Sequence, residues 1–116
     1  MAGQRLSERI TAIAAVYSNP DFLDTLEYHI PRLSVHPDGS LITVEPALAN
    51  QYRGDLYGLL SAVGVPRQYH WAIMRVNNMR SPTDYLTTMV QLIQPPYREI
   101  DDLQRIWSSS NNLSMG

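Results

Sequence analysis

The chain of 116 residues contains no cysteine and no lysine. The lack of cysteine excludes disulfides, thiolate zinc sites and cysteine nucleophiles. No run of about 18 apolar residues is present, so we expect no membrane-spanning helix. Residues 1–8 lack a basic segment followed by an apolar one, so we also expect no cleaved signal peptide and a cytoplasmic start.

The chain also has little excess charge of either sign, because its formal net charge is only −2. No nucleic-acid partner is therefore expected. All nine basic residues are arginine, whose planar fork suits packed polar interfaces, although codon bias would produce the same composition. Apolar residues make up 44% and charged residues 17% of the chain, which predicts a folded domain with a modest core.

Signatures of catalysis are missing as well. The three histidines, His29, His36 and His70, are far apart in the sequence, whereas a metal site needs at least three converging donors. No Gly-x-Ser-x-Gly elbow and no glycine-rich phosphate loop is found. The paired Asp101 and Asp102 suit the acidic first turn of a helix. We therefore predict no enzyme activity, no metal and no cofactor.

The N-terminal part, residues 1–46, is predicted to be a helical extension that ends in a β-hairpin. Apolar residues at helical spacing predict one helix over residues 6–17 and another over residues 22–30, with Asn19 as cap and Pro20 in its first turn. Pro31 is expected to end the second helix. Residues 32–45 alternate around a Pro-Asp-Gly turn, which predicts the hairpin.

The central part, residues 47–96, is predicted to be a β-α-α-β unit, so the fold class is α+β. Residues 47–52 are expected to be extended. Two short amphipathic helices follow, over residues 56–63 and 69–76, and then a strand over residues 87–93. The predicted core of this unit is Leu56, Leu59, Leu60, Ile73, Val76, Val90 and Leu92. Residues 97–116 are expected to form a short helix and, from Ser108, a flexible tail.

This central stretch resembles the LysM domain, a β-α-α-β module. Gly54 and Asp55 stand at its Gly-Asp opening, and the pair Asn77 and Asn78 stands at the end of its second helix. The sequence from Val90 to Pro95 is similar to the closing strand. The opening Thr of LysM and the Gly before its last strand are absent.

The aromatic start of the second helix narrows the resemblance. Tyr69, His70 and Trp71, followed by the Asn pair and Pro82, are similar to LysM-type subunits in the baseplates of contractile-tailed bacteriophages. In those subunits the module connects proteins. In other LysM modules it binds N-acetylglucosamine polymers of peptidoglycan, and the corresponding groove residues here are Gly54, Asp55, Tyr57, Asn77 and Pro82.

Local structure offers a simpler role for several of these residues. Asp55 is expected to cap the first helix of the module, and Gly54 to give the turn its backbone freedom. Asn77 and Asn78 are expected to satisfy the end of the second helix or to adopt a left-handed turn. These structural roles and a glycan groove remain alternatives.

Trp71 is the side chain that indicates an interface. At about 100° per residue it lies opposite the apolar stripe of its helix, near His70, Met74 and Arg75. These four residues are our predicted protein interface, since Trp, Met and Arg are enriched in interface cores. The alternative is that residues 1–46 fold over this face and bury it.

The function that these observations favour is non-enzymatic. We expect a structural connector of a bacteriophage tail or baseplate, located in the virion and assembled in the host cytoplasm. Its partners would be other tail or baseplate proteins, with many copies in a symmetric assembly and no nucleic acid or membrane. The alternative is a LysM module that binds peptidoglycan.

Overall fold

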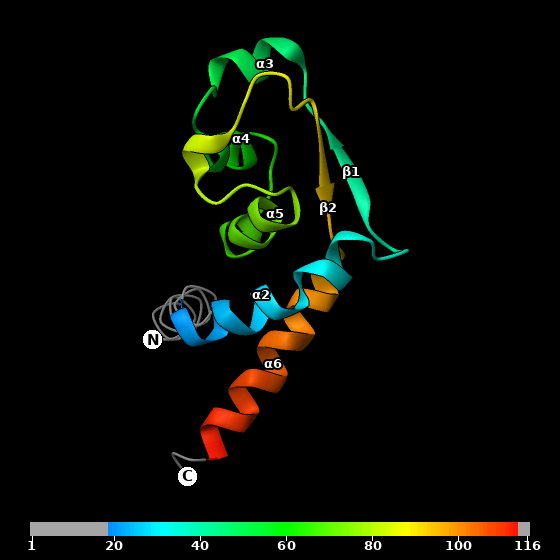
Figure 1. The fold of residues 1–116 in the computed structure, drawn as a ribbon, viewed down its shortest axis with the longest axis vertical. Helices are drawn as coiled ribbons and strands as arrows, with labels where there is room; N and C mark the ends of the chain where they lie inside the picture. The colour runs from blue at the N-terminus through cyan, green and yellow to red at the C-terminus, as the bar shows by residue number, and fades with distance from the viewer. Residues whose placement is uncertain (1–18, 114–116) are drawn as a thin grey trace, which may run out of the picture.

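A small two-stranded antiparallel sheet lies at one side of a group of helices in the computed structural model of the protein, which describes residues 19–113 (Figure 1). The fold class is α+β, as predicted. The elements, in chain order, are α2 (Pro20–Ser34), β1 (Ser40–Thr43), α3 (Pro46–Gln51), α4 (Leu56–Ala62), the 3-10 helix η1 (Arg67–Tyr69), α5 (His70–Val76), the 3-10 helix η2 (Pro82–Asp84), β2 (Gln91–Gln94) and α6 (Tyr97–Leu113). The helix predicted over residues 6–17 lies outside the described residues.

Helix α2 begins as predicted but ends later. The Asn19 side chain accepts a hydrogen bond from the Asp21 N–H at 2.9 Å, and Pro20 occupies the first turn. The helix then continues through Pro31 to Ser34, so the prediction that Pro31 ends it was wrong. Pro31 forfeits one backbone bond to Glu27, but both residues lie on the exposed side of α2. The fully buried Leu33 holds the last turn against the core.

The predicted β-hairpin over residues 32–45 is also wrong. The turn at residues 37–39 exists, with the Gly39 N–H donating to the His36 carbonyl at 3.0 Å, but it joins a helix to a strand. Strand β1 pairs with β2, about fifty residues later, and Leu41 faces Ile93 across the antiparallel ladder. The module thus takes its first strand from the segment that we had assigned to the N-terminal extension.

Residues 46–51 form helix α3 and are not extended, which corrects another prediction. Glu45 has an extended backbone at the N-cap position, and Pro46 opens the helix. Proline has its fixed φ and its missing N–H best accommodated in the first turn of a helix. Pro46 therefore starts a helix whose Ala49 is fully buried.

The two central helices and their caps follow the sequence closely. Asp55 caps α4, because its carboxylate accepts the Gly58 N–H at 3.0 Å. Gly64, with φ of +89°, reverses the chain after α4, and Asn78, with φ of +64°, does so after α5. The local predictions for Asp55 and Asn78 are confirmed.

The C-terminal elements differ from their predicted bounds. Strand β2 begins at Gln91, because a turn in which the Met89 N–H donates to the Leu86 carbonyl precedes it. Helix α6 continues to Leu113, so residues 108–113 are helical where we had predicted a tail. The continuation is supported by the Trp107 ring, whose centroid lies 5.8 Å from that of Phe22 on α2.

One hydrophobic core joins all parts of the described chain. Six of the seven predicted core residues are buried, and Val90 is half-buried. Side chains from α2 and α6 belong to the same cluster, among them Phe22, Leu26 and Ile100. The flanking helices are therefore packed into the module.

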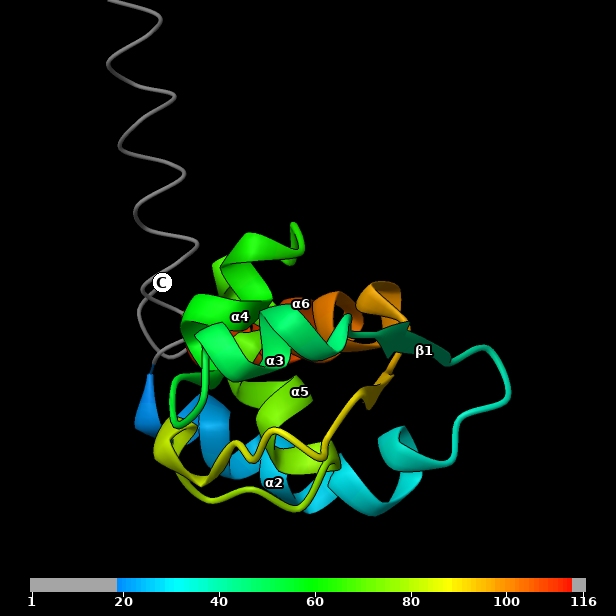
Figure 2. The same cartoon turned by 90° about the horizontal axis from the view of Figure 1, so that it is seen from above.

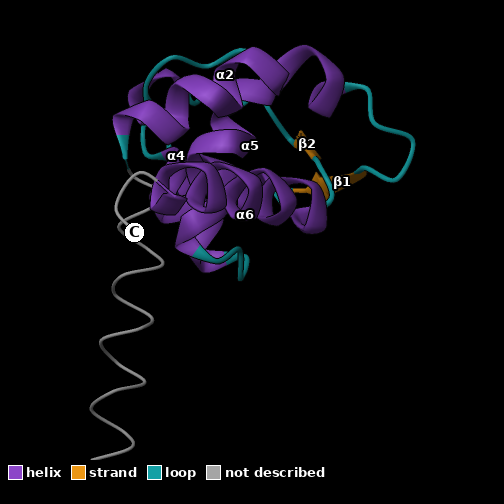
Figure 3. Cartoon of the chain, turned by 90° about the horizontal axis from the view of Figure 1, so that it is seen from below, coloured by secondary structure: helices purple, strands orange, loops and turns teal. Residues whose placement is uncertain are grey.

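Helix α2 packs against both α5 and α6 on one side of the molecule (Figures 2 and 3). The start of α6 is fastened to η1 by stacked rings of Tyr69 and Tyr97, with centroids 3.9 Å apart, and by the Tyr69 hydroxyl, which donates to the Asp101 carboxylate at 2.9 Å. Burial and this carboxylate raise the pKa of Tyr69 to about 12. Glu99 on α6 also pairs with Arg32 and His36.

Candidate functional site

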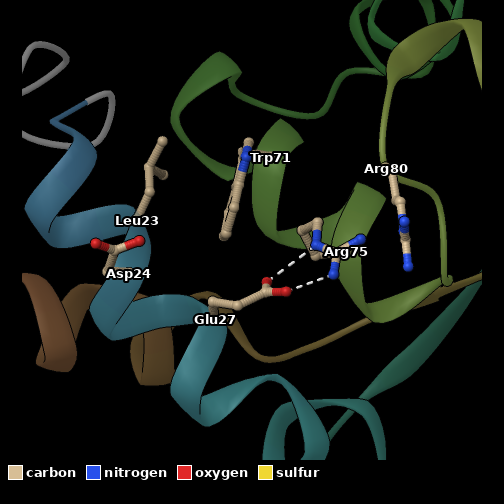
Figure 4. A pocket seen from close by; sticks show the side chains of 6 residues that line it. All are labelled: Leu23, Asp24, Glu27, Trp71, Arg75 and Arg80. Atoms are coloured by element: carbon tan, nitrogen blue, oxygen red, sulfur yellow. Dashed lines mark hydrogen bonds and ion pairs between the residues drawn. The ribbon is translucent and has the colours of Figure 1, made fainter.

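An open groove lies between α2 and α5, with Trp71 as its apolar wall (Figure 4). The groove has a volume of about 480 Å³. Its lining comes from three segments of the chain and consists of Leu23, Asp24 and Glu27 on α2, Trp71 and Arg75 on α5, and Arg80 in the loop after α5. Trp71 is half-buried, with one part packed on the core and the rest facing the groove.

Arg75 is held in place at the floor of the groove. Its Nε donates to the Glu27 carboxylate at 2.9 Å, its Nη2 donates to the other carboxylate oxygen, and its Nη1 donates to the Met79 carbonyl at 2.9 Å. The hydrogen bond from Arg75 lowers the pKa of Glu27, and the same pair raises the pKa of Arg75. Both groups stay charged near neutral pH, and the bidentate pair links α2 to α5.

The two rims of the groove carry opposite charges. Asp24 lies on the α2 side and Arg80 on the side of the loop (Figure 4). Both residues are exposed. Within residues 19–113 no ion pair joins the Arg80 guanidinium to an acid, and its backbone N–H donates to Asp84 at 2.9 Å. The groove therefore offers an arginine held by Glu27, an exposed arginine and an aromatic surface.

Two of the four predicted interface residues do not reach this surface. Met74 is 2% exposed and His70 is 4% exposed, so the prediction that they share an outer face with Trp71 was wrong. A surface helix would expose that face, but α5 has neighbours on several sides, with α2, α4 and β2 all in contact with it. Trp71 and Arg75 remain accessible at the groove.

His70 has a structural role beneath the surface. Its Nε2 donates to the Val65 carbonyl at 2.8 Å, and its ring lies 5.4 Å from that of Tyr57 between centroids. Burial lowers the pKa of His70, which favours the neutral imidazole. Burial also raises the pKa of Tyr57.

The residues of the candidate glycan-binding groove have different structural roles in the fold. Gly54 has φ of +71°, and its N–H donates to the Tyr85 carbonyl at 3.0 Å. Asp55 caps α4, and Pro82 opens η2 next to the capping residue Ser81. These assignments confirm the structural interpretation of Gly54 and Asp55.

Asn77 connects the end of α5 to strand β2. Its Nδ2 donates to the Ile73 carbonyl at 2.7 Å and to the Ile93 carbonyl at 2.9 Å, and its Oδ1 accepts the Ile93 N–H at 2.7 Å. The side-chain amide thus supplies both hydrogen bonds that a neighbouring strand would give to Ile93. Both polar atoms of the Asn77 side chain are engaged inside the protein.

The residues on the α2 side of the groove were not identified from the sequence. Asp24 and Glu27 are spaced i, i+3 on α2 and so share a side of the helix. That spacing indicates an acidic helix surface, but it does not reveal that Glu27 meets Arg75, 48 residues later. Apart from the charge of Arg80, nothing in the sequence indicated that this residue belongs to a binding surface.

Within residues 19–113, no group of three or more His, Asp or Glu side chains is placed to hold a metal ion. None of the helices in this part of the chain is both long and apolar enough to cross a membrane. Comparisons with protein-family models, curated proteins and solved structures found no match to the chain.

Proposed function

We propose that this protein is a structural connector of a bacteriophage tail or baseplate, acting through protein–protein contacts in the virion. The baseplate assignment is supported by the resemblance of residues 54–95 to LysM-type baseplate subunits. The contact role is supported by one observation, the groove that Trp71 lines together with Arg75 and Arg80. No catalytic role is part of the proposal.

The groove has the chemistry of a protein-binding site. Trp and Arg are the residue types that dominate the energetics of interfaces. Arg75 is already held by Glu27 and the Met79 carbonyl, so little side-chain entropy is lost when a partner binds it. Arg80 is available to a partner carboxylate, and Trp71 to an apolar side chain.

The test compares assembly with stability in the full-length protein. We expect Trp71→Ala to weaken association by about 2 kcal/mol or more, as for a central interface aromatic. Since Trp71 also touches the core, Arg80→Ala is the second variant, because it alters the groove only at an exposed side chain. Arg53→Ala, at an exposed arginine outside the groove, is the matched control. The measurements are urea unfolding and incorporation into tail particles when the gene is supplied in trans.

Two results would contradict the proposal. In the first, the Arg80→Ala and folded Trp71→Ala proteins enter particles as well as Arg53→Ala does. In the second, the wild-type protein shows saturable binding to chitin oligomers or purified peptidoglycan. That binding would favour the glycan alternative, in which case replacing Tyr57 should reduce it more than replacing Trp71.

A further inference from the structure

Strand β1 is the outer strand of the sheet. Figure 1 shows β2 between β1 and the helix α5, which contacts β2. The free edge of β2 is covered, because Asn77 bonds both the N–H and the carbonyl of Ile93. No such side chain is found on the outer edge of β1 within the described part of the chain. Within residues 19–113, the free edge of β2 is therefore hydrogen-bonded by a side chain, whereas the outer edge of β1 is not.

The register identifies the backbone groups that point outward from β1. The Val44 N–H donates to the Val90 carbonyl at 2.8 Å, so Val44 faces β2. Backbone groups alternate in direction along an antiparallel strand, so Ile42 faces β2 and Leu41 and Thr43 point away from it. Ile93, opposite Leu41, is turned outward in the same way, which agrees with its bonds to Asn77.

The outer edge is only four residues long, which limits pairing, but it lacks the other usual protections against pairing with another strand. Natural edge strands carry lysine, proline, inward charges or bulges. Strand β1 has the sequence Ser-Leu-Ile-Thr, with no charge and no proline, and its Leu41 side chain is 58% exposed. Glu45 and Pro46 come only after the strand and limit its length.

We infer that the β1 edge pairs with β1 of a second copy of this chain, about a two-fold axis at Ile42. In this register Leu41 of each copy faces Thr43 of the other, and both residues have outward N–H and carbonyl groups. Each of these pairs exchanges two hydrogen bonds, so every outward group of the strand is satisfied. The two Ile42 side chains meet at the axis, in a non-hydrogen-bonded pair where side chains approach most closely.

The uncharged strand favours a second copy over a different partner. An isologous contact places each residue opposite a residue of the same patch, so a charged edge would bring like charges together. Here the pairs are Leu with Thr and Ile with Ile, and Glu45 would face Gly39. The edge has no charge with which to select a foreign strand. The pairing is independent of the proposed function and uses a surface away from the Trp71 groove.

The first experiment is sedimentation of the full-length protein over a range of concentrations. A contact of four residues per strand is small, so the range should extend to about 1 mM, where weak interfaces populate. We expect the mass to rise from 13.2 kDa towards twice that value. A monomer throughout the range would overturn the inference. In parallel, amide hydrogen exchange at Leu41 and Thr43 should slow as the concentration rises, while Ile42 is already protected within the monomer.

Variants at two exposed positions test the register. The double variant Leu41→Lys with Thr43→Lys puts lysine opposite lysine twice and should weaken self-association at least about tenfold. Leu41→Lys with Thr43→Glu puts lysine opposite glutamate twice and should retain it. Thr43→Pro removes an outward donor without touching the bonds to β2 and should also dissociate the pair.

The outcomes separate clearly once circular dichroism has shown that the variants are folded. If the two double variants associate equally, the dimer uses another surface or register, and the inference is wrong. If the wild-type protein is monomeric but Thr43→Pro alone fails to enter particles, the edge accepts a strand from a different protein, which also refutes pairing between copies.

Discussion

Replacement of Asn77 tests the connection between α5 and the sheet. In the folded protein this half-buried side chain makes three hydrogen bonds, to the Ile73 carbonyl and to both backbone groups of Ile93. Asn77→Ala removes all three and leaves the N–H and carbonyl of Ile93 without their partners on the side that faces α5. We therefore expect a loss of stability without a change of fold.

The magnitude follows from the number and burial of these bonds. A typical intramolecular hydrogen bond contributes about 0.5–1.5 kcal/mol net, and an unsatisfied buried group costs more. Three bonds at a half-buried site give an expected loss of about 2–4 kcal/mol. Asn77→Asp should be nearly as damaging at neutral pH, because it keeps an acceptor for the Ile93 N–H but turns a carboxylate oxygen towards two carbonyls.

Urea unfolding monitored by circular dichroism measures this loss. Asn78→Gly is the matched control, because the adjacent Asn78 has φ of +64°, which glycine adopts without strain, and the change should be nearly neutral or mildly stabilising. A loss below about 0.5 kcal/mol for Asn77→Ala, the level of ordinary surface sites, would refute the reasoning. It would mean that water replaces the amide at no cost.

Two further predictions concern the core. Leu60→Ala, at a fully buried position of α4, should destabilise the protein by about 2–5 kcal/mol in the same assay, and a surface-like value would show that α4 is packed differently. Because burial lowers the pKa of His70 from its ordinary value of 6.5, the unfolded state binds the proton more readily, so stability should be complete above that pH and should fall as the pH drops from 6.5 to the folded pKa. The free energy of unfolding, measured from about pH 7.5 to about pH 5, should therefore fall more steeply with decreasing pH for the wild type than for His70→Gln. An equal pH dependence in the two proteins would contradict the lowered pKa of His70.

Local features of this protein were predictable from its sequence. The i, i+3, i+4, i+7 spacing located α4 and α5, and the capping roles of Asn19 and Asp55 followed from their side chains. The left-handed turn at Asn78 was also predictable, since few residues adopt positive φ easily. Each of these features depends on neighbours within about four residues.

Other features were decided by contacts between distant segments. Pro31 was wrongly predicted to end a helix, because the helix continues to bury Leu33 in the core. Residues 47–52 were wrongly predicted to be extended, because a helix there buries Ala49. The partner of β1 was mistaken, since the hairpin turn is a local signal and the true pairing spans about fifty residues. Met74 and His70 could not be recognised as core residues, because a helical period shows one buried face, whereas α5 is enclosed on several sides.

The candidate groove also depends on contacts between distant segments of the chain. The helical spacing of the sequence was enough to place Trp71 and Arg75 on one helix, one turn apart. Only the tertiary structure brought α2 beside that helix, paired Glu27 with Arg75 and placed Arg80 on the opposite rim. The physical reason is that helix periodicity depends on backbone geometry, which is local, whereas the packing of α2 on α5 depends on burying apolar surface from segments far apart in the chain.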